Sequence, residues 1–195
     1  MSKAAKYRQV VGTYRASYQF QIVASQAAAS RVWEVRNSHA TNRLLVTRLS
    51  VQWLQTAAHT AALTAALEAF KYTGFSVVDP TDSATFNGTS SSDGGVAAPG
   101  SAQFRGVTAS GVAAGMTGGT LTKSGAAWSR LRKWMLLAVP TAGENPTTVM
   151  ELVLPQSPWT ILPDEGIVIE NAILLGVAAG STVNVDVALR EMQPY

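Results

Sequence analysis

The chain has 195 residues, of which 47% are hydrophobic and only 14% are charged, with a formal net charge of +3. This length suits one domain with a full core, and the small net charge does not by itself indicate a nucleic-acid binder. The chain has no cysteine, which excludes disulfides and thiolate metal sites. Because the charged share lies well below the roughly 25% of typical domains, we expect other subunits to cover much of the surface. The alternative is a neutral surface rich in Ser, Thr, Ala and Gly.

Charge is unevenly distributed along the chain. Residues 1–48 hold eight basic side chains and one acid, whereas residues 144–195 hold seven acids and one base. The two ends could be neighbours in one sheet and cancel locally, or they could meet between subunits. The pattern favours neither arrangement.

Residues 1–16 are basic and unpatterned, which predicts an N-terminal arm that seeks an acidic surface. Its candidate contact residues are Lys3, Lys6, Arg8 and Arg15. The arm lacks the apolar core of a signal peptide, and no uninterrupted apolar run in the chain approaches the ~20 residues of a membrane span. We therefore expect neither a secretory leader nor a membrane partner.

Four strands are predicted before residue 81, because apolar residues recur at every second position there. A strand has a side-chain period of two, so residues two apart share a face. The predicted strands cover residues 17–24, 31–36, 45–53 and about 66–78. Between the last two, the alanine-rich residues 57–64 are assigned to a turn or a short helix, although intrinsic propensity alone favours a helix.

Residues 81–127 differ in composition from the rest of the chain. They hold ten of the 16 glycines, and Ser, Thr and Ala fill most of the other positions. A segment of this composition cannot bury much apolar surface of its own. We therefore predict a long Gly/Ser/Ala-rich insertion within one fold, which is either disordered or ordered by a partner.

The β pattern resumes after the insertion and ends in a predicted hairpin. Strands are expected at 128–139 and 149–154, and the proline-rich residues 155–163 are expected to be extended but unpaired. Residues 166–176 and 181–190 form the two arms of the hairpin, joined by a Gly/Ala-rich reversal. The apolar residues that share one face of the second arm are Val183, Val185, Val187 and Leu189.

No set of residues has the spacing of an active site or a metal site. The two histidines, His39 and His59, have no carboxylate or second histidine at ligand spacing, so hydrogen-bonding roles in loops are expected for them. The string Gly115–Ser124 superficially resembles a phosphate loop, but Thr122 stands where that loop needs a glycine before the lysine. Residues 164–165, two adjacent acids, are interpreted as part of a turn, with a cation site as the alternative. We expect no enzymatic activity, no cofactor and no metal.

The densest basic cluster, Arg130-Leu-Arg-Lys-Trp134, lies in the first strand after the insertion. On a regular strand, alternate residues of this region share one face. Those residues are Trp128, Arg130, Arg132 and Trp134. Arginine and tryptophan are enriched at interface anchors, so we expect a contact with another subunit or a scaffold. The same mixture could contact nucleic acid, but we expect no direct binding to it.

Eight predicted strands, a basic arm, long loops and no catalytic set fit an all-β fold. The expected form is an eight-stranded jelly-roll sandwich with a long Gly/Ser-rich insertion, that is, two four-stranded sheets of paired Greek keys. The domain plan is the arm over residues 1–16 and a single jelly-roll domain over residues 17–195, which includes the insertion at 81–127. Such sandwiches are used in viral shells.

Two segments, Arg43–Leu63 and Ile161–Gly176, resemble stretches of small structural proteins of tailed bacteriophages. Within that group the resemblance is to accessory head proteins of the cement or decoration class. The glycine-rich insertion departs from the resemblance, which leaves the partner-facing region undefined. The resemblance implies an oligomer, often a trimer, that bridges neighbouring capsomers.

From these points we expect a structural virion protein that binds the major capsid protein across subunits and stabilises the head. We expect it to form a homo-oligomer, most simply a cyclic trimer, and to be located in the virion head after assembly in the host cytoplasm. One alternative is another virion component, such as a tail or head–tail protein. Another is a carbohydrate-binding jelly-roll module that uses Trp33, Trp53 or Trp159. Trp53 lies in the apolar register of its strand, which favours a core position over a sugar platform.

Overall fold

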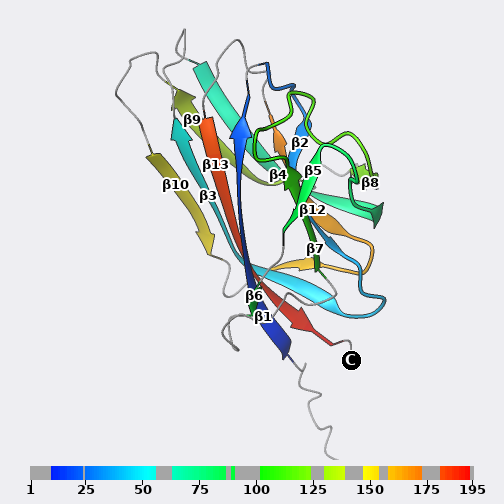
Figure 1. Ribbon diagram of the computed structural model, residues 1–195. Helices are drawn as coiled ribbons and strands as arrows, with labels where there is room; N and C mark the ends of the chain where they lie inside the picture. Colours follow the sequence, from blue (N-terminus) through cyan, green and yellow to red (C-terminus); the bar gives the residue numbers. More distant parts are fainter. Residues whose placement is uncertain are drawn as a thin grey trace, which may run out of the picture.

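Two antiparallel β-sheets that pack face to face make up the computed structural model (Figure 1). The structure describes residues 10–23, 25–55, 63–86, 89–90, 102–123, 130–138, 147–153, 158–172 and 181–193. All regular structure in these residues is β-strand, and none of it is helix. The all-β class predicted from the alternating apolar residues is therefore confirmed.

The first sheet, sheet A, has six strands. Its path runs in order through β10 (Thr147–Val153), β3 (Arg43–Gln55), β13 (Ser181–Met192), β1 (Val10–Ile22) and β6 (Thr89–Ser90), and β11 (Trp159–Ile161) also pairs with β3. Strand β13 lies between β1 and β3 and pairs with both along its whole length. The basic and acidic ends of the chain are thus neighbours in one sheet, which is one of the two arrangements that the charge distribution allowed.

The second sheet, sheet B, has seven strands. Its path runs in order through β5 (Ser83–Phe86), β7 (Ala102–Val107), β2 (Ser30–Asn37), β12 (Gly166–Asn171), β4 (Leu63–Val77) and β8 (Thr120–Lys123), and β9 (Arg130–Ala138) also pairs with β4. Strand β12 lies between β2 and β4, and all six of its residues are buried. Both faces of sheet B are therefore covered at its centre.

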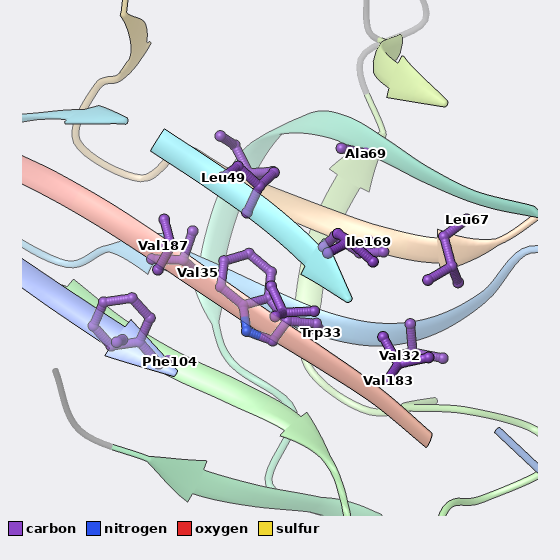
Figure 2. Packing of buried hydrophobic residues seen from close by; sticks show 14 of the residues in the cluster. Val32, Trp33, Val35, Leu49, Leu67, Ala69, Phe104, Ile169, Val183 and Val187 are labelled. Carbon is purple, nitrogen blue, oxygen red and sulfur yellow. The ribbon is translucent and has the colours of Figure 1, made fainter. Parts of the chain in front are cut away.

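The hydrophobic core fills the space between the sheets (Figure 2). The four apolar residues of β13 that were predicted to share a face are all buried in it, and Asn184 and Asp186 between them are half-exposed. The largest fully buried side chains include Trp33, Trp53, Trp134, Phe20 and Phe75. At roughly 25 cal/mol per Å² of apolar surface removed from water, packing of this kind is the main stabilising term of the fold.

The predicted C-terminal hairpin is wrong. Strand β12 belongs to sheet B and pairs with β2 and β4, whereas β13 belongs to sheet A and pairs with β1 and β3. The chain therefore crosses from one sheet to the other between Asn171 and Ser181. The sequence pattern misled because β12 is buried on both faces, so its apolar run carries no alternation that could specify a partner strand.

Other strand boundaries also differ from the prediction. Strand β1 begins at Val10, so residues 10–16 of the predicted arm belong to sheet A, and residues 1–9 lie outside the described residues. Within residues 155–163, predicted to be unpaired, β11 pairs with β3. The described residues form more strands than the eight predicted, because the insertion and this proline-rich segment contribute short strands. The predicted turn or short helix at 57–64 falls largely outside the described residues.

The described part of the insertion packs on the same chain. It contributes β5, β6, β7 and β8, and its side chains Phe104, Val107 and Met116 are buried in the core. The expectation that this region is disordered or needs a partner for order is therefore wrong for residues 102–123. A few large apolar side chains spaced among glycines are enough to dock it, because the two sheets already supply the surface they cover.

Candidate interaction surfaces

The residues singled out from the sequence as contacts lie in different environments. Arg15 is exposed on β1 and Arg132 is exposed on β9, whereas Trp134 is buried in the core. Arg130 pairs with Phe70 of β4 through its backbone. The remaining contact candidates lie outside the described residues and are Lys3, Lys6, Arg8 and Trp128.

The predicted common face of the basic cluster on β9 is broken by a bulge. The register shifts so that Arg130 pairs with Phe70, while Arg132 pairs with the adjacent Ala69. Neighbouring residues of β4 point to opposite faces, and accordingly Ala69 lies in the core and Phe70 in a cluster on the outer face. One extra residue in β9 therefore breaks the strict alternation between residues 130 and 132 on which the predicted row depended.

The tryptophans considered as a sugar platform are packed on the core. Trp33 and Trp53 are almost completely buried, and the partly buried Trp159 packs against the same cluster. A stacking platform needs an exposed aromatic face. Trp33 and Trp53 supply none, and Trp159 is only partly exposed.

The outer face of sheet A carries hydrogen-bonding side chains. On β1, Ser17, Gln19 and Gln21 are exposed, and on β13 Thr182 and Asn184 are half-exposed. The Ser17 hydroxyl donates to Oδ1 of Asn184 at 3.1 Å, so the polar side chains form links across the strands. The part of the face around Ser17, Gln19, Gln21, Thr182 and Asn184 is therefore polar, which suits close packing against another polar surface.

A hollow of about 340 Å³ interrupts this face, and we call it the arginine hollow. Its lining residues are Arg15, Ala16, Ser17, Arg48, Asp186, Val187 and Ala188. Arg15 on β1 and Arg48 on β3 both pair with Ala188 on the strand between them. The small alanine leaves space between two long cationic side chains. Arg190, two residues further along β13, is exposed on the same face.

A bulge shapes the arginine hollow. Ala188 pairs with Arg48 and Leu189 pairs with Val46, so Thr47 is an extra residue in β3. The Thr47 hydroxyl donates to the Ala188 carbonyl oxygen at 3.2 Å. Bulges change the direction of neighbouring side chains and are common beside functional sites. Here the bulge lies beside Arg48 at the hollow.

The insertion covers the outer face of sheet B. There a second apolar cluster forms from Phe70, Tyr72, Phe75 and Val168, with Leu121 of β8 packed against it. The Met116 amide donates to the Arg31 carbonyl oxygen at 2.8 Å, and β8 pairs with β4. This cover accounts for the burial of β12 on both sides.

A buried ionic group, the Arg31 clamp, fastens the insertion at this face. Arg31 forms ion pairs with Glu34 at 3.3 Å and Asp79 at 3.6 Å and also donates to the Gly118 carbonyl oxygen. Oδ2 of Asp79 accepts the Gly118 amide at 2.6 Å, and Oδ1 accepts the Thr81 amide at 2.7 Å. Asp79 thus holds the segment that enters the insertion and a loop near its end.

Beside the clamp lies a polar cleft of about 380 Å³. Nζ of Lys123 contacts Oε2 of Glu170 at 2.6 Å and lies 3.4 Å from the centre of the Phe70 ring, and Tyr72 donates its hydroxyl to the same glutamate. Burial raises the pKa of Glu170 to about 7, the charge of Arg31 lowers it, and Glu68 on the adjacent strand raises it. These groups are partners of one another and connect β8 to β12. The cleft is therefore a structural connection between the two strands.

Sequence reasoning missed the buried acids of the clamp and of the cleft, although a signal was present. Glu34 lies within the apolar strand segment Val32–Val35, and Glu170 directly follows the apolar residues Ile167–Ile169 in the same strand. A charged residue in a buried strand must itself be buried, and an ionisable group is buried only with partner groups. Such a residue therefore indicates that another part of the chain covers the outer face of the strand. The lysine and arginine partners come from distant parts of the chain and could not be assigned from spacing.

The histidine that the structure describes has a local role. Nδ1 of His39 accepts the backbone amides of Thr41 at 3.0 Å and Asn42 at 2.8 Å, as expected for a loop histidine. Within the described residues no three His, Cys, Asp or Glu side chains gather as a metal site would require. Among those same residues there is also no helix that could cross a membrane.

Comparison with known proteins gives no assignment. No protein-family model matches the chain, and no curated protein has a similar sequence.

Proposed function

We propose that the eight strands outside the insertion and the proline-rich segment form a jelly roll to which the other strands are added. Four of them lie in sheet A in the order β10-β3-β13-β1, and four lie in sheet B in the order β2-β12-β4-β9. This order supports two interlocked Greek keys, since the chain passes repeatedly between the sheets. Strands β5 to β8 belong to the insertion and β11 to the proline-rich segment, which explains the number above eight.

We further propose that the protein is a structural component of a virion. In this proposal it is a cement protein of a tailed-phage head that binds across subunits of the major capsid protein as a homo-oligomer. The observation that carries the proposal is the combination of a filled interior with an exposed polar sheet. Three tryptophans and many aliphatic side chains occupy the space between the sheets, which favours a function on the outside, and the outer face of sheet A offers hydrogen-bonding groups.

Electron microscopy of purified particles with and without this protein tests the proposal. We expect density for the protein on the head and lower resistance of the depleted particles to heat or low salt. Density on the tail or at the head–tail junction would favour the alternative virion component. Absence of the protein from purified particles would contradict a virion role altogether.

A further inference from the structure

Residues 112–123 of the insertion lie over the outer face of sheet B, and we call them the latch. Polar contacts with buried acids fasten them there. The Gly118 amide donates to Oδ2 of Asp79 at 2.6 Å, and Nζ of Lys123 contacts Oε2 of Glu170 at 2.6 Å. Asp79 and Glu170 are both buried. The attachment of the latch therefore depends on the charge state of acids that water hardly reaches.

Glu170 lies directly opposite a second buried acid. In the register of sheet B it pairs with Glu68 of β4 on one side and with Arg31 of β2 on the other. Glu68 and Glu170 are both buried, and like charges directly opposite each other on adjacent strands are destabilising. When two carboxylates share a buried site, ionising both is costly, and the pKa of one of them rises.

The cations beside these two acids are less buried than the acids themselves. Lys123 contacts Glu170 and Lys133 contacts Glu68 at 3.0 Å, but their side chains are 40% and 36% exposed, so water screens their charges. Arg31 is shared, because its guanidinium also forms the ion pairs of the clamp. The other titratable or charged side chains that face the buried acids of the clamp and of the cleft are Tyr72, at Glu170, and Arg105, at Glu34.

We propose that the latch is a pH-sensitive element: Glu170 holds a proton while residues 112–123 are closed on sheet B, and loss of this proton as the pH rises raises the population of an open form. A protonated Glu170 still accepts hydrogen bonds from Lys123 and Tyr72, and no charge then lies opposite Glu68. After ionisation, two like charges are buried opposite each other. Opening of the latch lets water reach Glu170 through the polar cleft that it lines, which relieves both the burial and the repulsion.

The direction of the pH effect follows from the pKa of Glu170. Burial raises this pKa to about 7, the charge of Arg31 lowers it, and Glu68 raises it. A solvated glutamate titrates near 4.5, so the closed latch binds more protons than the open latch between pH 4.5 and 7. The closed form is therefore most favoured at the acidic end of this window, and its advantage decreases as the pH rises. The inference concerns the insertion itself and does not depend on the proposed virion role.

The chain has no cysteine, so a single introduced thiol can report on the opening of the latch. Met116 in the latch is buried and its neighbour Thr117 is exposed. The variants M116C and T117C are labelled with a small dipyridyl disulfide from about pH 5 to about pH 8, and the ratio of their rates removes the pH dependence of thiol reactivity itself. A third variant, V185C, places the thiol in the core on β13, where only global unfolding exposes it.

We expect the ratio of the M116C rate to the T117C rate to rise by roughly tenfold across this pH range, and V185C to react much more slowly than M116C. Adding E170Q to M116C should remove most of the rise, because Gln cannot ionise. The matched control is E191Q, which replaces a buried glutamate of sheet A and should keep the rise. If M116C lowers the melting temperature, hydrogen exchange of the amides of residues 112–123 in the unchanged chain and in E170Q replaces the thiol measurement.

Three results would overturn the proposal. A ratio that stays constant, or that increases as the pH falls, would show that the ion pair between Lys123 and Glu170 outweighs the cost of burying the charge. Equal labelling of M116C and V185C would show that the thiol is exposed only by global unfolding, so that no separate latch exists. An undiminished rise in E170Q would show that another group controls the opening.

Discussion

Two glutamates of sheet B, Glu34 and Glu170, are almost fully buried and are held by cations. Burial raises the pKa of each to about 7, and the charge of Arg31 opposes the rise in both cases. In an unfolded chain a glutamate titrates near 4.5, so the native state binds more protons between pH 4.5 and 7. The free energy of unfolding therefore decreases as the pH rises through this window and levels off above it.

Replacing Glu170 by Gln should reduce this pH dependence. Gln cannot ionise, so the part of the decrease that comes from Glu170, roughly 1 to 3 kcal/mol, should disappear. Urea unfolding at pH 5 and pH 8 measures the difference. The control D164N changes an exposed acid and should leave it unaltered. Equal pH dependence in E170Q and the unchanged protein would contradict the buried-acid explanation.

Gly115 shows how closely the insertion approaches sheet B. It has φ of +70°, and a Cβ at this position would lie 2.6 Å from the Arg31 carbonyl oxygen. G115A should therefore combine backbone strain with a steric clash and lower stability by roughly 2 to 4 kcal/mol. Gly74 has φ of +58° but open space around it, so G74A should cost only about 1 kcal/mol. Thermal unfolding of both variants compares them, and equal losses would show that the contact is not tight.

At the scale of elements, Asp79 links the two ends of the described insertion. Removing its carboxylate in D79A breaks the ion pair with Arg31 and the hydrogen bonds to Thr81 and Gly118. We expect residues 102–123 to resist limited proteolysis in the isolated protein and to become cleavable in D79A, since local opening exposes the backbone. The neighbouring exposed acid provides the control D82A. Rapid cleavage within 102–123 of the unchanged protein would contradict internal packing.

Strand β1 gives a second prediction at this scale. Because residues 10–16 pair with β13, deleting residues 1–16 should remove half of a sheet edge and lower the melting temperature strongly. Deleting residues 1–9 should leave the melting temperature nearly unchanged while removing three basic side chains of the arm. Comparison of the two truncations by circular dichroism measures both effects. Equal melting temperatures would show that the first half of β1 adds little to the fold.

For the whole molecule, assembly remains a prediction. The low charged share of the chain and the polar outer face of sheet A favour a homo-oligomer, most simply a cyclic trimer. Light scattering across a range of protein concentrations should give about three times the mass of one chain. If the protein stays a monomer at every concentration, it does not self-associate, and any assembly would depend on binding to the partner surface.

The fold class could be predicted from the sequence, but the contacts between distant segments could not. The alternation in β13 predicted one buried face because its outer side meets solvent. Strand β12 gave a false hairpin because residues buried on both faces lose that alternation. The bulge in β9 and the pairing of Arg31 with Asp79 depend on where separate strands meet, which spacing along the chain does not encode.

The neighbourhood of β1 and β13 has a kinetic consequence. Val10 pairs with Met192, and after a bulge the two strands stay in register from the pair Gly12 and Glu191 to the pair Ile22 and Ser181. The first described strand therefore finds its main partner in the last described strand. The two strands can pair only after the long chain between them has closed into a loop. The entropic cost of this closure slows folding. Until β13 arrives, the hydrogen-bonding edges of β1 and β3 stay open to other chains. Folding within one chain and association between chains therefore compete for the same strand edges, and the balance between them depends on the protein concentration.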